Sequence, residues 1–165
     1  MVPWIAFVGG HNSGKTTVVS GLIRELSQRG FKIAAIKHAR SPLVIEGHRD
    51  SEQLFAAGAR IGYTASPGLA LRYQREERAK TLPEIYAEVA PGMDLVMVEG
   101  FKQEPGPKIE VLRQEINSSL LEVEGLIARV ADFAPGDDLP RFDHGDFTGL
   151  ADFILHYFHL RQRNE

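Results

Sequence analysis

The feature that most constrains the fold is a glycine-rich loop between an apolar segment and a helical pattern near the N-terminus. Gly9 to Thr17, with the sequence GGHNSGKTT, match the phosphate-binding pattern GxxxxGK[ST]. Trp4 to Val8 form an apolar run that predicts a buried strand before the loop. The sequence therefore predicts a strand, a phosphate loop and a helix, and with them a nucleoside triphosphate site. Apolar residues after the loop recur at helical spacing: Val18, Val19, Leu22, Ile23 and Leu26.

Each part of this loop has an expected chemical role. Gly9 and Gly14 allow the backbone to turn and to approach phosphate oxygens closely. Lys15 is the expected charge for the β- and γ-phosphates, and the hydroxyl of Thr16 is an expected Mg²⁺ ligand. A helix that begins near Lys15 directs its unpaired amides at the same point. A turn without a ligand is the alternative. The other residues expected to line the phosphate site are Gly10, His11, Asn12, Ser13 and Thr17.

Composition narrows the class of protein. The 165 residues, of which 43% are hydrophobic, predict a single domain over residues 1–165. With 19 basic and 22 acidic residues the net charge is −3, so neither a nucleic-acid nor a membrane partner is expected. No apolar stretch reaches the roughly 18 residues of a membrane span, and no basic leader precedes the loop, so a cytoplasmic protein is expected. Cysteine is absent, which excludes disulfides and thiol chemistry.

Short apolar runs alternate with helical patterns along the rest of the chain. This alternation predicts an α/β fold, the three-layer sandwich of P-loop nucleoside triphosphatases, with a mostly parallel sheet and helices on both faces. Ile61 to Ala65 and Leu69 to Tyr73 predict a possible antiparallel hairpin extension, and Asp50 is an expected N-cap of a helix that ends at Gly58. Other expected strands are Lys32 to Lys37, Asp94 to Val98, Ile109 to Leu112 and Leu126 to Val130; other expected helices are Thr81 to Ala90 and Asp146 to Leu160.

In a parallel sheet, ligands collect at the carboxyl ends of the strands. Glu99 ends an apolar strand and is expected to hold Mg²⁺ or its water shell, and the amide of Gly100 could face the γ-phosphate. A surface glutamate in a turn is the alternative. Lys37 and His38 end the second strand, which is expected to adjoin the strand before the phosphate loop. The lysine could reach phosphate there, although a charged pair could also mark the solvent boundary. Asp50 could lie beside the metal or only begin a helix.

Several short motifs occur in an order that resembles the molybdopterin-guanine dinucleotide biosynthesis adaptor proteins, the MobB family. The resemblance runs from Ile5 to about Asp132, and the final helix suits it. Each motif is short, and only the phosphate loop is specific alone. The motifs are Ser13 to Thr17, Lys37-His38, Asp50-Ser51 with Ala57 to Ala59, Val98 to Lys102, and Lys108 to Leu112.

The resemblance implies a GTP-binding protein that uses Mg²⁺ and assists the guanylyltransferase that joins GMP to molybdopterin. It also implies at most a slow GTPase activity and a homodimer, and it leaves direct binding of molybdopterin open. Gly14 to Thr17 would hold phosphates and metal, Glu99 and Gly100 would face the γ-phosphate, and Asp50 would belong to a switch loop. No residue is identified as catalytic.

The choice of GTP rests on the resemblance, because the residues alone do not separate GTP from ATP. The guanine-reading motif NKxD is absent. Asp132 follows the strand Leu126 to Val130 and is the nearest substitute, although a solvent-facing loop aspartate is the preferred interpretation.

Two other classes of protein share the phosphate loop. A small-molecule kinase would need a basic lid, for which Arg72, Arg75, Arg78 and Lys80 are candidates, although Glu76 and Glu77 dilute their charge. A metal-insertion GTPase would need a metal-binding segment. The chain has six histidines and no cysteine, and Asp143 to Asp146 are explained by a turn before a helix.

Overall fold

The computed structural model describes residues 1–39, 41–45, 49–116 and 119–161. They form two compact units, which are described separately here: Met1–His38 together with Leu82–Glu165, and Ala39–Thr81. The division reflects packing in the folded chain, so the expectation of one folding domain stays a prediction. None of the helices in the described ranges is both long and apolar enough to cross a membrane.

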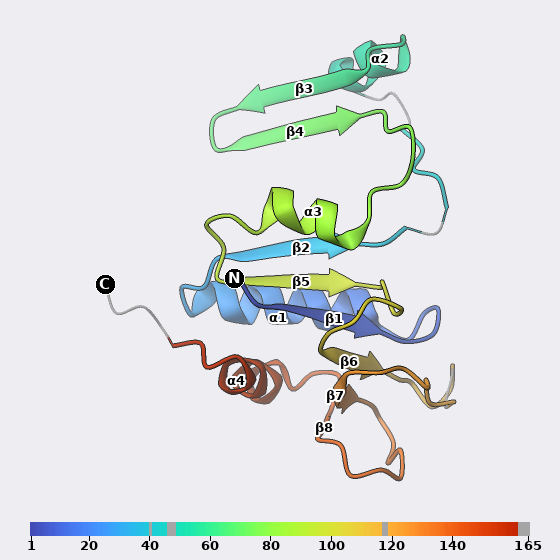
Figure 1. Ribbon diagram of the computed structural model, residues 1–165, viewed down its shortest axis with the longest axis vertical. Coiled ribbons are helices and arrows are strands. Elements are labelled where there is room, and N and C mark those ends of the chain that lie inside the picture. The colour runs from blue at the N-terminus through green and yellow to red at the C-terminus, as the bar shows by residue number, and fades with distance from the viewer. Residues whose placement is uncertain (40, 46–48, 117–118, 162–165) are drawn as a thin grey trace. The chain divides into compact units, whose positions relative to one another are not determined.

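The first unit is built on a six-stranded sheet with the order β2-β5-β1-β6-β7-β8 (Figure 1). Each pair of neighbouring strands in it is parallel, as the alternation of strands and helices predicted. β5 lies between β1 and β2, so the expectation that the second strand adjoins the strand before the phosphate loop is wrong. The strands are β1 (Trp4–Val8), β2 (Ile33–Lys37), β5 (Leu95–Glu99), β6 (Lys108–Val111), β7 (Leu126–Val130) and β8 (Arg141–Phe142).

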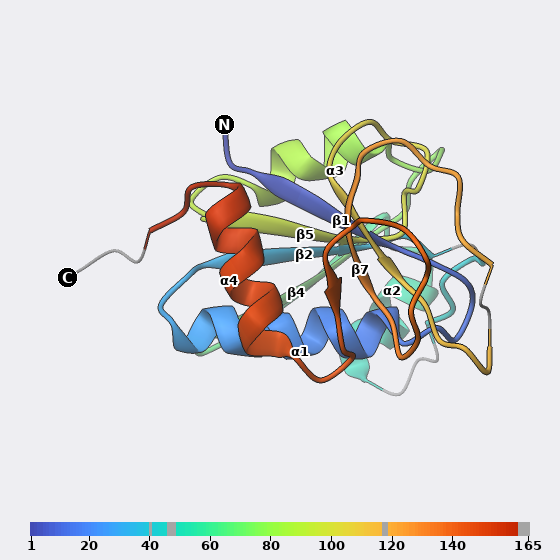
Figure 2. The ribbon, with the colours of Figure 1, turned by 90° about the horizontal axis from the view of Figure 1, so that it is seen from below.

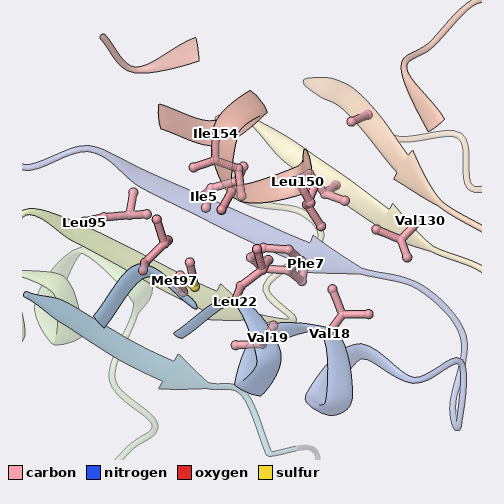
Figure 3. Packing of buried hydrophobic residues seen from close by; sticks show 14 of the residues in the cluster. Ile5, Phe7, Val18, Val19, Leu22, Leu95, Met97, Val130, Leu150 and Ile154 are labelled. Carbon is pink, nitrogen blue, oxygen red and sulfur yellow. The ribbon is translucent and has the colours of Figure 1, made fainter. Parts of the chain in front are cut away.

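Helices cover both faces of this sheet, as predicted. α1 (Lys15–Gln28) and α4 (Phe147–Tyr157) lie on one side of the strands, and α3 (Leu82–Val89) lies on the other (Figure 2). Because side chains alternate along a strand, Ile5 and Phe7 of β1 point to α1 and α4, where they pack against residues such as Leu22 and Ile154 (Figure 3). This packing fixes α1 directly behind β1, and so fixes the loop that joins them.

Charged side chains of β6 and β7 contact the loops that pack on these two strands. Glu110 and Arg129 are neighbours in the register of these strands and form a buried ion pair. Glu110 Oε1 also accepts a hydrogen bond from the backbone N–H of Leu121 at 2.7 Å, and Arg129 Nε donates to Asp137 Oδ2 at 2.8 Å. Lys108 Nζ donates to the carbonyl of Glu124 at 2.7 Å. Polar contacts thus hold two loops on this part of the sheet.

The second unit contains α2 (Asp50–Ala56) and the predicted hairpin, formed by β3 (Ile61–Ser66) and β4 (Leu69–Gln74) in antiparallel register. Phe55 of α2 packs on Tyr73 of β4, with 5.8 Å between the ring centroids. The N-cap of α2 is Arg49 and Asp50 is the first helical residue, so the predicted cap is wrong by one position. The charge of Asp50 still suits the positive end of the helix.

Candidate nucleotide-binding site

The phosphate loop lies at the carboxyl end of β1. From β1 the chain continues to β2 on one side of the sheet, and from the neighbouring β6 it continues to β7 on the other side. The carboxyl ends of β5 and β6 flank it on either side. Open parallel sheets bind ligands at such a topological switch point, because the loops after two neighbouring strands run in opposite directions there and leave a crevice between them. The architecture therefore places Glu99, the last residue of β5, beside the loop that begins at Gly9.

Two glycines fix the conformation of this loop. Gly9 has φ of +148°, and a Cβ on it would lie 2.3 Å from the carbonyl oxygen of Val111 in β6. Gly14, the N-cap of α1, is in the left-handed region at φ of +92°. Both positions require glycine, as expected, but at Gly9 the close neighbour is the backbone of an adjacent strand. The loop is thereby held against β6.

Lys15 bends back over the loop. Its Nζ donates to the carbonyl of Gly10, to the carbonyl of Gly9 at 3.3 Å and to the hydroxyl of Ser13 at 3.3 Å. The Ser13 side chain is buried, which supports this arrangement from below. An ammonium group held at the centre of the loop offers a positive charge at the position where the motif binds β- and γ-phosphates.

The first turn of α1 is suited to an anion. Gly14 has no side chain that could cap the helix, and the first turn contains no acidic residue. The helical hydrogen bonding begins with the N–H of Val18, which donates to the Gly14 carbonyl at 3.0 Å. The backbone N–H groups before it precede the intrahelical ladder, and the helix dipole favours negative charge at this end.

Thr16 and Glu99, the two predicted metal ligands, lie in contact. The hydroxyl of Thr16 donates to Glu99 Oε2 at 2.9 Å. A hydroxyl and a carboxylate are hard oxygen donors, which Mg²⁺ prefers, and Mg²⁺ bound through one or two protein groups completes its shell with water and phosphate oxygens. The donor set therefore fits Mg²⁺, which would neutralise phosphate charge when bound.

Lys37 is the third predicted residue at this point. Its Nζ lies 2.5 Å from Glu99 Oε1 and donates to Thr16 Oγ1 at 3.1 Å. His38, the next residue, stacks its ring on Phe101 with 4.4 Å between centroids, so it packs against the loop after β5. Lys37 thus lies with the two predicted metal ligands, while the described contact of the His38 side chain is a packing contact.

Other predicted site residues have different surroundings. The N–H of Gly100 donates to the carbonyl of Phe7 at 3.0 Å, so in this structure that amide is not offered to a phosphate. His11, Asn12 and Thr17 are exposed on the loop and the first turn of α1. Asp50 belongs to the second unit, so its role beside the metal stays a prediction.

Asp132, the candidate for reading guanine, joins the segments that follow β6 and β7. Its Oδ1 accepts a hydrogen bond from the backbone N–H of Gln114 at 2.9 Å. This bond lowers the pKa of the carboxyl group below its ordinary value, with smaller contributions from the charges of His144 and Arg113. Asp132 is therefore an ionised acceptor at neutral pH, which base recognition requires, and that role stays a prediction.

Comparison with known proteins gives the family. The family model described as MobB, molybdopterin guanine dinucleotide synthesis protein B, matches residues 4–132. The chain belongs to this family. The match covers both flanking strands, the phosphate loop and Glu99, and it confirms the resemblance drawn from the motifs.

Curated relatives and solved structures agree with the family match. A molybdopterin-guanine dinucleotide biosynthesis adapter protein from Haemophilus influenzae is 33% identical over 96% of this chain and 92% of its own length. The Escherichia coli adapter protein is 30% identical over 95% of this chain and 94% of its own. A crystal structure of a MobB homolog from Bacillus stearothermophilus matches with a TM-score of 0.74 at 25% identity, covering 98% of this chain and all of the other.

The MobB-family chain also has polar residues at the phosphate loop that sequence reasoning missed. A Cβ on Gly14 would lie 3.4 Å from His144 Nδ1 and 3.5 Å from a terminal nitrogen of Arg113. His144 Nε2 lies 2.7 Å from the carbonyl oxygen of Leu112. Arg113 follows β6 as Glu99 ends β5, so the rule of strand ends could have found it. His144 had no such signal, because only the folded chain brings it to Gly14.

The structure also bears on the motifs of the alternative functions. Asp146 caps α4 by accepting the Gly149 N–H at 2.9 Å, as a turn before a helix requires. Among the described residues there is no group of three or more His, Cys, Asp or Glu side chains that could hold a metal ion. In the second unit, Arg75 stacks over Phe55 at 4.6 Å from the ring centroid, and Lys80 pairs with Glu76 at 3.1 Å. These contacts make the basic run part of the hairpin unit.

Proposed function

We propose that this chain is a GTP-binding member of the adapter family of molybdopterin guanine dinucleotide biosynthesis, and that it assists the guanylyltransferase that joins GMP to molybdopterin. The contact of Thr16 with Glu99 beside the Lys15 loop carries the proposal. It supports the proposal because a hydroxyl and a carboxylate, donors that Mg²⁺ prefers, lie together beside a loop whose ammonium group suits phosphate. Family membership supplies the pathway.

The residues divide the work of binding. Lys15 and the first turn of α1 bind the phosphates, and Thr16 and Glu99 hold Mg²⁺, which neutralises the charge of the triphosphate. Arg113 lies beside Gly14 on the β6 side, and the family resemblance implies at most a slow GTPase activity. We therefore infer that GTP hydrolysis is slow, and that the bound nucleotide serves recognition by the partner enzyme.

The first test measures GTP binding by calorimetry. Lys15→Ala should abolish detectable GTP binding in the presence of Mg²⁺, because the loop loses the charge at its centre. Lys32→Ala is the matched control, since Lys32 is an exposed lysine just before β2, at the opposite end of the sheet. Unchanged GTP affinity in the Lys15 variant would remove the site assignment.

Guanine selectivity has a separate test. Asp132→Asn should lower the affinity for GTP relative to ATP, because an amide has one acceptor oxygen, whereas a carboxylate offers one oxygen to each of the N1 and N2 groups of guanine. The same calorimetric titration with both nucleotides gives the ratio. An unchanged ratio would show that Asp132 serves only to tie β6 to β7.

A small-molecule kinase is the second candidate, since it shares the phosphate loop. The basic residues that it would need as a lid have contacts within the hairpin unit. They are Arg72, Arg75, Arg78 and Lys80. Single-turnover reactions with radiolabelled GTP and candidate acceptors decide the matter. Stoichiometric transfer of a phosphoryl group to any acceptor would replace the adapter proposal.

A homodimer in the cytoplasm completes the proposal. The second unit exposes large apolar side chains, among them Leu54, Ile61, Tyr63 and Leu69. Several large apolar side chains exposed on one small unit are typical of an interaction site. Sedimentation analysis should give twice the chain mass of 18.3 kDa, and Tyr63→Lys should shift the protein toward the monomer.

A further inference from the structure

Lys37 and Glu99 face each other across two parallel strands. They are register partners in β2 and β5, and each is the last residue of its strand. Cross-strand partners project to the same face of a sheet, so the pairing follows from the backbone and not from a chance rotamer. The Lys37 ammonium group lies 2.5 Å from Glu99 Oε1.

The same ammonium group also donates a hydrogen bond to the hydroxyl of Thr16. Lys37 Nζ donates to Thr16 Oγ1 at 3.1 Å, while that hydroxyl donates its own hydrogen to Glu99 Oε2 at 2.9 Å. A hydroxyl oxygen has two lone pairs and an ammonium group only donates. The three groups therefore form a closed triangle in which one positive charge contacts both predicted metal ligands.

A divalent cation and this ammonium group compete for the same oxygens. A metal ion bound by Thr16 Oγ1 and Glu99 needs lone pairs that now accept from Lys37. A divalent cation and an ammonium group that lie within a few ångströms of each other also repel. Lys37 and the metal ion thus exclude each other from the triangle.

The side chain of Lys37 is able to move away from Glu99 and Thr16. Its side chain is 59% exposed, against 14% for Glu99. Lysine carries a strongly hydrated charge on a flexible stem, and an ion pair with one exposed partner is weak. Glu99 is fixed at the end of a strand that has neighbours on both sides, so the lysine is the partner that moves.

We propose that Lys37 occupies the cation position of the phosphate site in the metal-free protein, and that a divalent cation binds there by displacing it. The inference rests on the proposed function, which supplies the metal and the triphosphate. Lys37 is a positioning residue in this scheme: it keeps Thr16 and Glu99 together without metal. Once displaced, it leaves a positive charge at the rim of the site for an anionic oxygen.

The experiment measures binding of Mn²⁺ alone to the nucleotide-free protein by electron paramagnetic resonance. Lys37→Met should bind Mn²⁺ about fivefold more tightly than the natural chain, because loss of an exposed ion pair removes about that much competition. Lys32→Met is the matched control and should stay within about twofold, since it loses the same charge from the other end of β2. Unchanged or weaker binding by the Lys37 variant, or no Mn²⁺ binding by either form, overturns the proposal.

A second measurement needs no variant. Acylation of the natural chain, read by mass spectrometry, should modify Lys37 more strongly relative to Lys32 when Mg²⁺ is added, because displacement exposes the amine. A constant ratio at a Mg²⁺ concentration that saturates the site overturns the proposal. Both measurements use metal without GTP. Failure of GTP binding would therefore reject the proposed function, whereas failure here with intact GTP binding would reject only the role of Lys37.

Discussion

Two ion pairs link neighbouring strands of the same sheet, and they differ in almost everything except their register. Lys37–Glu99 joins the ends of β2 and β5, and Arg129–Glu110 joins β7 to β6. In the first pair the lysine is 59% exposed, and in the second the two side chains are 6% and 0% exposed. Glu110 has its partners in a backbone amide and a buried arginine, whereas the partners of Glu99 are the Thr16 hydroxyl and an exposed lysine.

The difference shows that burial decides whether an ion pair between a glutamate and a basic residue stabilises the fold or is available for binding. A buried carboxylate needs every partner it has, because removal of one leaves an uncompensated charge in a medium of low polarity. An exposed pair is weak and exchanges partners at little cost, so its groups are available for binding. The comparison can be tested from both sides.

The largest expected effect is on the buried pair. Arg129→Met should lower the free energy of unfolding by about 3–5 kcal/mol, since Glu110 would remain buried without its counter-charge. Urea denaturation followed by circular dichroism measures the change. Arg129→Met combined with Glu110→Gln should recover part of the loss, because the buried charge is then absent. A loss below about 1 kcal/mol for the single variant would contradict the assignment.

The next effect is on Glu99, the carboxylate of the pair at the ends of β2 and β5. Glu99→Gln should weaken GTP binding in Mg²⁺ by about tenfold or more, as expected for the loss of a charged ligand contact, while GTP binding in EDTA changes little. Calorimetry in both conditions gives the ratio. If the free energy of unfolding fell as far as in the Arg129 variant, Glu99 would be a structural residue like Glu110.

Lys37→Met should change stability least among the four residues of the two pairs. The expected loss in the free energy of unfolding is below about 1 kcal/mol, because the lysine is largely solvated. The same urea titration measures it. A loss above about 2 kcal/mol would mean that the triangle of Thr16, Lys37 and Glu99 holds the fold together, and the contrast with β6 and β7 would disappear.

The smallest effect is a dependence on pH at the rim of the buried pair. The side-chain hydrogen bond from Arg129 lowers the pKa of Asp137 below its ordinary value of 3.8. Because the pKa of Asp137 is lower in the folded chain than in the unfolded chain, Asp137 stabilises the fold at any pH above its unfolded-state pKa. This stabilisation is lost as the pH falls through its folded-state pKa. The stability difference between the natural chain and Asp137→Asn, under about 1 kcal/mol at pH 7, should therefore shrink below about pH 4. A stability difference that stays constant between pH 7 and pH 3 would contradict this prediction.

Much of the fold could be predicted from the sequence because it depends on periodic patterns. The run before Gly9 and the helical spacing after it gave β1 and α1, and the run before Glu99 gave β5. β8 was missed because two residues carry no period. The position of β5 between β1 and β2 could not be read, since strand order depends on packing between distant segments.

The candidate site divides in the same way. The motif and the rule of strand ends predicted Lys15, Thr16, Glu99 and Lys37, and the structure brings the last three into contact. Nothing in the sequence showed that the Gly100 amide would donate to Phe7 or that His144 would reach Gly14. Those contacts depend on the paths of loops, which have no pattern to read.

The contact of Gly9 with β6 has a consequence for how strongly this site can bind. Because a backbone carbonyl of Val111 closes off the space beside Gly9, the start of the phosphate loop is fixed when the sheet forms. The conformational entropy of that segment is lost during folding and not at the moment of association. A ligand that reaches the loop meets donors already in position, so more of the energy of its contacts appears as affinity.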